Sequence, residues 1–142
     1  MNPELPIDDY LSLIQDHLKD HNSVVITAEP GAGKTTRLPP SLLDYIDGKI
    51  LVLEPRRVAA LAAASRICTE QAWTLGKEVG YHVRFDNRTS NETRLIFMTE
   101  AMLSRLILKN PELKGIGAIV LDEFHERSIH SDLALGWIKE LQ

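Results

Sequence analysis

Short runs of consecutive apolar residues alternate along the chain with segments whose apolar residues recur every three or four positions. Such short apolar runs are typical of strands buried on both faces, and the wider spacing is typical of amphipathic helices. Strands are predicted at 24–27, 49–55, 94–99 and 115–121, with a shorter extended segment at 79–85. Helices are predicted at 7–18, 34–46, 56–73, 100–110 and 128–142, and a polar loop at 86–93.

The regular alternation of strands and helices defines the expected fold class. It predicts an α/β domain in which a parallel sheet carries helices on both faces, giving a three-layer α/β/α arrangement. In such sheets ligands bind beyond the carboxyl ends of the strands. Polar residues that directly follow the predicted strands are therefore the first candidates for a functional site.

Composition narrows the possible function classes. The chain has 142 residues, 44% of them hydrophobic and 25% charged, and a net charge of −4. No global basic field favours nucleic acid, so any such contact has to be local. Cys68 is the single cysteine, which excludes an internal disulfide and suits a reducing compartment. No apolar run is long enough to span a membrane. We therefore expect a cytoplasmic protein.

The segment AEPGAGKTT, residues 28–36, follows the first predicted strand and leads into a predicted helix. It matches the phosphate-binding pattern G-x-x-x-x-G-K-T/S except that Ala28 replaces the first glycine. The two glycines let backbone N–H groups turn toward one anion. Lys34 can reach the β- and γ-phosphates, and the Thr35 hydroxyl can bind magnesium. The predicted nucleotide-binding residues are Glu29, Pro30, Gly31, Ala32, Gly33, Lys34, Thr35 and Thr36.

Asp122 and Glu123 directly follow the apolar run AIVL, at the carboxyl end of a predicted strand. In phosphate-loop enzymes an acid at this place holds magnesium. A neighbouring glutamate can orient or deprotonate the attacking water. Two adjacent acids also arise where a strand simply meets solvent. Together with the phosphate loop, the pattern favours a metal site at Thr35 and Asp122, with Glu123 as the base.

Several ordered motifs together resemble one helicase family. DEFHER, residues 122–127, resembles the DExH signature of superfamily 2 helicases, and LEPRRVAA, residues 53–60, resembles motif Ia of the DEAH-box RNA helicases. VGYHVRFDNRTS and MTEAML resemble the next two conserved segments. With AEPGAGKTTRLP, the set most resembles the bacterial HrpB-type ATP-dependent helicases. The departures are Ala28, Ala101 and Phe124, and none removes a reactive group.

The resemblance implies a RecA-like phosphate-loop domain that uses ATP, with other nucleoside triphosphates as alternatives, and Mg²⁺. Lys34, Asp122 and Glu123 would be catalytic, and His125 would couple the nucleotide site to a second motor domain. Arg66 matches the arginine that stacks on adenine in DEAH relatives. A planar cation on a π-face needs no base-specific hydrogen bond, so weak base selectivity is expected. A solvated helix arginine is the alternative interpretation of Arg66.

The resemblance also implies contacts to nucleic acid. Arg56, Arg57, Arg84 and Thr99 lie at family positions that touch the RNA backbone. Backbone contacts carry no sequence information, so single-stranded or partly duplex RNA of any sequence is expected, with DNA as an alternative. Two adjacent arginines are also common at a solvated helix start.

The resemblance covers only the N-terminal part of a first RecA-like domain, residues 1–142. The Ser-Ala-Thr motif and the second domain with its arginine finger are expected beyond Gln142, and the remainder of the helicase chain is an expected partner. The Ser-Ala-Thr strand would lie between 24–27 and the strand that ends before Asp122. Without it, we expect the chain to be marginally stable, or 24–27 to pair with AIVL, or another copy of the chain to fill the gap.

Two other function classes compete with a helicase. A small phosphate-loop kinase would need an arginine-bearing lid and an acceptor site, which no segment supplies. A non-enzymatic, nucleotide-gated RNA-binding module stays open.

Overall fold

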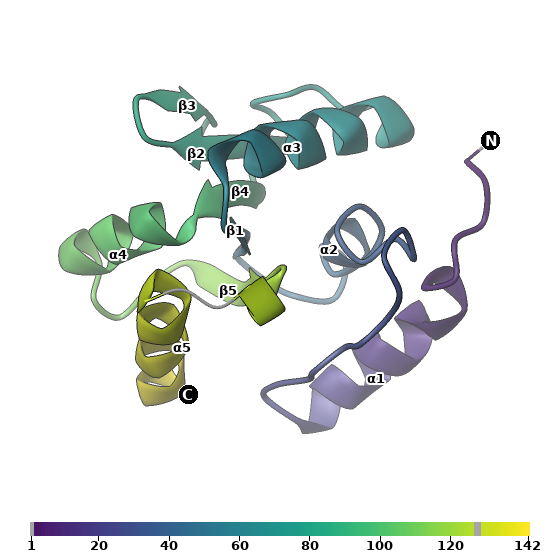
Figure 1. The fold of residues 1–142 in the computed structure, drawn as a ribbon, viewed down its shortest axis with the longest axis horizontal. Helices are drawn as coiled ribbons and strands as arrows, with labels where there is room; N and C mark the ends of the chain where they lie inside the picture. Colours follow the sequence, from purple (N-terminus) through teal and green to yellow (C-terminus); the bar gives the residue numbers. More distant parts are fainter. Residues whose placement is uncertain (1, 127–128) are drawn as a thin grey trace.

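A mostly parallel β-sheet forms the centre of the molecule (Figure 1). The computed structural model describes residues 2–126 and 129–142. Within these residues the strand order is β3-β2-β4-β1-β5. The strands are β1 Lys49–Glu54, β2 Val79–Val83, β3 Asp86–Arg88, β4 Leu95–Thr99 and β5 Ile116–Leu121. The predicted parallel sheet is confirmed for β2, β4, β1 and β5, whose carboxyl ends share one edge.

The antiparallel strand β3 corrects the prediction that 86–93 is only a loop. A tight turn after β2 returns the chain along its own path, with Phe85 in the left-handed region at φ 67°. Tyr81 then pairs with Arg88, and Val83 pairs with Asp86. The β3 side chains are polar because this strand lies at the edge of the sheet, where water covers it.

Alternate residues of the central strands face two separate hydrophobic clusters, as the two-residue repeat of a strand requires. Ile50 and Val52 of β1 face one cluster, which α3 (Arg57–Gln71) covers together with the N-terminal helices. Leu51 and Leu53 face the other, which α4 (Glu100–Lys109) and α5 (Ile129–Leu141) cover. The predicted three-layer arrangement is confirmed.

Four of the five predicted helices form as expected. A 3-10 turn, Asp8–Tyr10, leads into α1 (Leu11–Asp20), and α3, α4 and α5 match their predicted segments. A second 3-10 turn, Phe124–Glu126, follows β5. Ser128, at the start of the last predicted helix, lies outside the described residues.

The helix predicted over 34–46 is wrong in extent. Only α2, Leu38–Ser41, is helical, between turns at 34–37 and 42–45. Pro39 and Pro40 lack the N–H groups that would donate to the carbonyls four residues earlier. A continuous helix from the loop is therefore interrupted, and the Arg37 N–H closes a single turn onto the Gly33 carbonyl at 2.8 Å.

The strand predicted at 24–27 is also wrong. Among the described residues no ladder joins this segment to β5, so the expected pairing with AIVL does not form. Val24 and Ile26 instead pack on the cluster that includes Ile14 of α1, and Val25 is 91% exposed. Two of its three apolar side chains are thus partly buried against this cluster instead of within the sheet. Among the described residues β5 pairs on one side only, and most β5 residues are half-buried.

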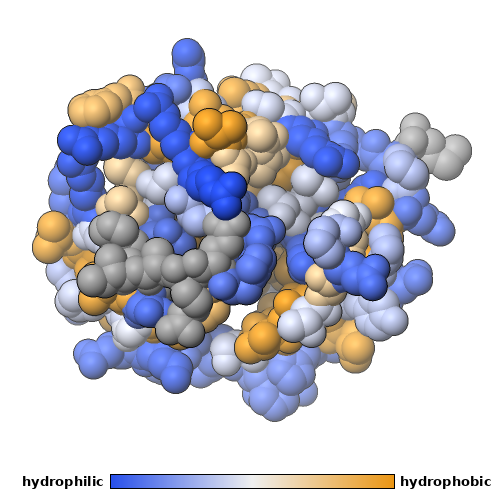
Figure 2. All heavy atoms as spheres, viewed as in Figure 1, coloured by the Kyte–Doolittle hydropathy of each residue, from blue (hydrophilic) through white to orange (hydrophobic). Residues whose placement is uncertain are grey.

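The visible surface is mixed in character. On the face shown in Figure 2, hydrophobic residues occur as separate patches among hydrophilic ones. No helix within the described residues combines the length and apolar character needed to cross a bilayer.

Candidate nucleotide site

The glycine-rich loop has the backbone that its sequence predicts. Gly31 and Gly33 have φ values of 82° and 97°, in the region that L side chains rarely adopt. A Cβ on Gly33 would also approach Leu5 Cδ1 to 2.9 Å and Ile7 Cγ2 to 3.0 Å. Ala28 is not among the residues with positive φ, so alanine causes no backbone strain there. The departure from the usual pattern is therefore tolerated.

Lys34 folds back over this loop. Its Nζ donates a hydrogen bond to the Ala28 carbonyl oxygen, which joins the two ends of the loop. The N-terminal segment also contacts the loop, because the Ile7 N–H donates a hydrogen bond to the Ala32 carbonyl at 3.0 Å. The lysine and the loop backbone thus form one local unit.

A hydrogen bond connects this unit to the end of β5. Thr35 Oγ1 donates to Asp122 Oδ2 at 2.5 Å, although the residues are 87 positions apart. Asp122 is fixed further, since its N–H donates to the Leu53 carbonyl at 3.0 Å and its Oδ1 accepts the Glu123 N–H at 3.0 Å. Glu123 has φ 52°, an uncommon conformation for this residue type that costs of the order of 1 kcal/mol or more. Such strained residues cluster at functional sites.

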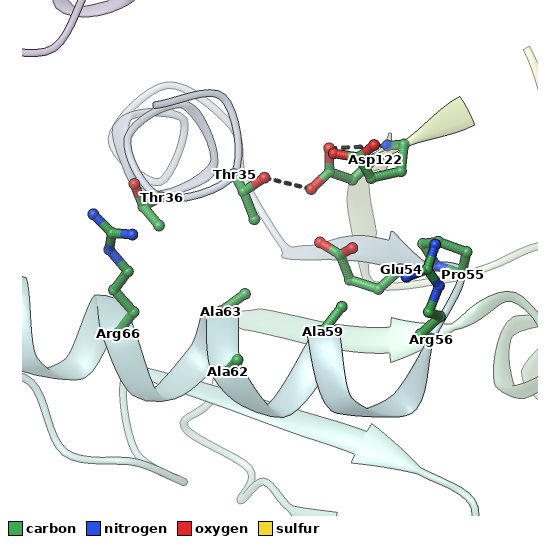
Figure 3. A pocket seen from close by; sticks show the side chains of 11 residues that line it. Thr35, Thr36, Glu54, Pro55, Arg56, Ala59, Ala62, Ala63, Arg66 and Asp122 are labelled. Atoms are coloured by element: carbon green, nitrogen blue, oxygen red, sulfur yellow. Dashed lines mark hydrogen bonds between the residues drawn. The ribbon is translucent and has the colours of Figure 1, made fainter. Parts of the chain in front are cut away.

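An open pocket of about 500 Å³ lies beside these residues (Figure 3). Small side chains of α3, Ala59, Ala62 and Ala63, form its floor. Arg66 lies at the end opposite Asp122, 64% exposed at the side chain and paired with Glu70 at 2.8 Å. Of the predicted nucleotide-site residues, the lining contains Thr35, Thr36, Arg66, Asp122 and Glu123. Glu29, Pro30, Gly31, Ala32, Gly33 and Lys34 lie on the loop and do not line it.

The oxygen atoms of Thr35 and Asp122 suit magnesium, which prefers hard oxygen ligands and retains several waters. Among the described residues no three His, Cys, Asp or Glu side chains are arranged to hold a metal by themselves. This is the composition expected of a site in which phosphate and water oxygens supply the remaining ligands.

His125 lies at the mouth of the site. Its Nε2 is 3.2 Å from Glu123 Oε2, and its side chain is 76% exposed. Its side chain is therefore accessible from outside the site. Arg127, the last residue of the DEFHER motif, lies outside the described residues.

The predicted nucleic-acid residues follow three neighbouring strands. Arg84 comes directly after β2, Thr99 ends β4, and Arg56 lies two positions after β1. Because β2, β4 and β1 are adjacent and parallel, these positions form a row along the edge of the sheet where Asp122 follows β5. Arg57 begins α3 in the same row. Arg56, Arg57 and Arg84 are exposed, and the Arg84 guanidinium lies 4.8 Å from the Phe85 ring centre.

Glu54 is a pocket residue that the sequence interpretation missed. It ends β1 and is 2% exposed, although it lines the pocket. Burial, and then a hydrogen bond and charge repulsion from Asp122, raise the pKa of its carboxyl to about 9. The available signal is a single acid at the end of an otherwise apolar strand, in KILVLE.

This buried acid predicts a pH-dependent stability. With a pKa of about 9 in the folded protein and 4.5 as the ordinary value, Glu54 contributes most below pH 4.5, and its contribution falls as the pH rises toward 9. The loss is at most about 1.4 kcal/mol per pH unit. In thermal unfolding, the Tm of Glu54→Gln should therefore rise relative to the wild type, by at most roughly 3–6 °C per pH unit between about pH 5 and 8.

The exposed Glu92→Gln, which changes the net charge equally, is the control and should show a constant difference from the wild type. A Glu54→Gln variant with the same pH profile as the wild type would contradict the assigned burial of this carboxyl.

The parallel sheet, together with the hydrogen bond that joins the glycine-rich loop to the end of β5, defines a RecA-like α/β domain of the phosphate-loop class. The chain belongs to the DEAD/DEAH box helicase family, whose model matches residues 11–133. A solved structure of Escherichia coli DEAH/RHA helicase HrpB superposes with a TM-score of 0.93 at 43% identity, covering 97% of this chain and 18% of that one. A second, described as the E. coli DExH-box NTPase HrpB, gives a TM-score of 0.95 at 42% identity, covering 100% of this chain and 18% of that one.

Curated relatives agree with this family. A probable ATP-dependent RNA helicase of Saccharomyces cerevisiae, DHR2, is 39% identical over 146 residues, covering 99% of this chain and 20% of that protein. The human probable ATP-dependent RNA helicase DHX40 is 39% identical over 142 residues, covering 98% and 18%. The chain thus spans about a fifth of the length of the curated relatives it matches.

Proposed function

We propose that this chain is the ATP-binding, N-terminal part of the first RecA-like domain of an ATP-dependent RNA helicase. The observation that carries the proposal is the hydrogen bond from Thr35 to Asp122, which brings the glycine-rich loop and the acidic strand end to one pocket. The relatives named as probable ATP-dependent RNA helicases support the same function.

Each side chain of the site has a definite role in this proposal. Lys34 and the N–H groups of the loop bind the nucleotide phosphates. Thr35 and Asp122 hold Mg²⁺, which neutralises charge on the phosphate oxygens. Glu123 orients the attacking water and accepts its proton. Arg66 stacks on the base without reading it, so nucleoside triphosphates other than ATP are also accepted.

The exposed arginines are proposed to bind the RNA backbone. The chain carries a net charge of −4, so attraction to RNA has to come from the local row that contains Arg57 and Arg84. This row continues to Asp122, which directly follows β5, so RNA bound along the row would lie beside the nucleotide pocket. A second RecA-like domain is proposed as the partner, and His125 is exposed where that domain could contact it.

We also propose a cytoplasmic location, because a single free cysteine suits a reducing compartment.

Arg57→Ala and Arg84→Ala are each expected to weaken RNA binding and to flatten its salt dependence. Each lost phosphate contact on a single strand lowers the log–log slope of affinity against salt by roughly 0.7. Fluorescence anisotropy with oligonucleotides of two unrelated sequences, at several salt concentrations, measures this slope. Arg105→Ala changes an exposed arginine of α4 and should leave the slope unchanged. Sequence-selective binding, or unchanged slopes in both variants, would contradict the backbone contacts.

The proposed enzyme class is tested by ATP hydrolysis in a longer chain that includes the second RecA-like domain. Hydrolysis stimulated by single-stranded RNA supports an RNA helicase, and stimulation by DNA alone supports the DNA alternative. Tight binding of ATP and RNA without any turnover would show a nucleotide-gated binding module instead.

A further inference from the structure

Glu54 is a pocket residue to which the proposed chemistry assigns no task. It lies at the end of β1, between β4 and β5, and its side chain reaches the pocket from beneath Thr35 and Asp122 (Figure 3). It is 2% exposed, and its Oε1 accepts no hydrogen bond from any described group. A buried polar atom without a partner costs about 1–3 kcal/mol, so it needs an explanation.

The surroundings of Glu54 indicate the kind of partner that is missing. The acids Asp122 and Glu123 follow the neighbouring strand β5, and Glu100 begins the helix after β4, on the other side. All three repel a charge on Glu54. Several acids that converge on one pocket are stabilised by a cation or by donors that a cation orients. An anionic or apolar occupant next to Oε1 would leave the repulsion in place.

We propose that Glu54 is a positioning residue for the metal: its unpaired oxygen accepts hydrogen bonds from water molecules bound to the Mg²⁺ that Thr35 and Asp122 hold. This rests on the proposed function, because the metal enters with the nucleotide phosphates. Glu54 thereby raises the affinity for magnesium–nucleotide relative to free nucleotide. Groups outside the direct ligands commonly tune metal affinity in this way, by about 10–100-fold.

Calorimetric titration with ADP, in Mg²⁺ and separately in EDTA, tests the assignment. Glu54→Met preserves an unbranched buried side chain but has no oxygen acceptor, and Glu54→Gln keeps a neutral acceptor. We expect Glu54→Met to lose about 10-fold or more in affinity with Mg²⁺ and to match the wild type in EDTA. Glu54→Gln should lose less than Glu54→Met, because its amide oxygen can still accept a hydrogen bond from a water molecule. The exposed Glu92→Gln is the charge-matched control.

A second readout reports the metal itself. With Mn²⁺ in place of Mg²⁺, electron paramagnetic resonance of free Mn²⁺ should show weaker retention of the ion by Glu54→Met in the presence of ADP. If Glu54 serves only packing, both variants should lower the Tm and weaken ADP binding equally with and without metal, which would overturn the proposal. Unchanged metal dependence in a folded Glu54→Met, or in Glu54→Gln if Glu54→Met does not fold, would also overturn it.

Failure of the proposed function has a different signature. In that case the wild type itself would bind ADP no better in Mg²⁺ than in EDTA, and Lys34→Ala would bind ADP as the wild type does. Weakened ADP binding in Lys34→Ala, together with wild-type metal dependence in both Glu54 variants, would overturn only the role of Glu54.

Discussion

Glu123→Gln, in a chain that includes the second RecA-like domain, is expected to retain ATP binding and to lose turnover by about 10²–10⁴-fold. Glutamine has nearly the same size and can hold a water molecule by a hydrogen bond, but it cannot accept the proton of that water. The backbone of Glu123 is held through its N–H bond to Asp122, so the change leaves the metal ligand in place. Its side chain is 41% exposed, so little burial is lost.

The measurement is steady-state ATP hydrolysis with saturating RNA, alongside ATP binding by calorimetry. Glu112→Gln removes an exposed carboxylate that pairs with Lys114 in a turn, and it should keep wild-type turnover. A Glu123→Gln enzyme with turnover within a few-fold of the wild type would show that another group is the base. Residues 1–142 alone should turn over slowly in any case, because an arginine finger contributes roughly 10³–10⁵.

A longer chain that continues through the next strand of the proposed domain is expected to melt about 10 °C higher than residues 1–142. Within the described part of the chain β5 is paired on one side only, and Val25 is 91% exposed. In the proposed family arrangement the next strand lies between β5 and the segment that contains Val25. A strand between them would form ladder bonds on both sides, each contributing about 1 kcal/mol net. In a domain of this size each kcal/mol of added stability shifts the Tm by roughly 2–4 °C, so a few such bonds together account for a shift of about 10 °C.

Thermal unfolding of both chains, with hydrogen exchange of the β5 amides, measures this effect. An extension of equal length with a scrambled sequence is the matched control and should leave Tm unchanged. If residues 1–142 fill the gap with a second copy, their Tm should depend on protein concentration. Equal melting of the two chains, with both monomeric, would contradict the proposed position of the missing strand.

The sequence predicted strands correctly where a local run of apolar residues agrees with the general rule that strands of a parallel sheet are covered on both faces. The apolar runs of β1 and β4 are buried on both faces, so they predict their own place in a parallel sheet, and the similar run of β5 forms a strand that is mostly half-buried. The loop and Asp122 were singled out because a strand was predicted before each; only β5, before Asp122, forms, and only the structure shows the Thr35 contact that joins the two segments.

The failures have a common cause, which is that pairing partners and burial depend on distant parts of the chain. Residues 24–27 form a short apolar run typical of a buried strand, but such a run cannot specify whether a neighbouring strand is present. Glu54 reads as a solvent-facing strand end, and its burial is set by β4, β5 and α3, which come later in the chain. The interruption after Lys34, in contrast, was readable from Pro39 and Pro40.

The central claim is that the glycine-rich loop binds the phosphates of a nucleotide with magnesium. Calorimetric titration of residues 1–142 with ADP and Mg²⁺ tests it most directly, comparing the wild type with Lys34→Ala and with the exposed control Lys77→Ala. Hydrogen bonds to charged groups contribute about 1.5–3 kcal/mol, so Lys34→Ala should bind about 10–100-fold more weakly while Lys77→Ala binds as the wild type does. Equal affinity of the wild type and Lys34→Ala would contradict the account.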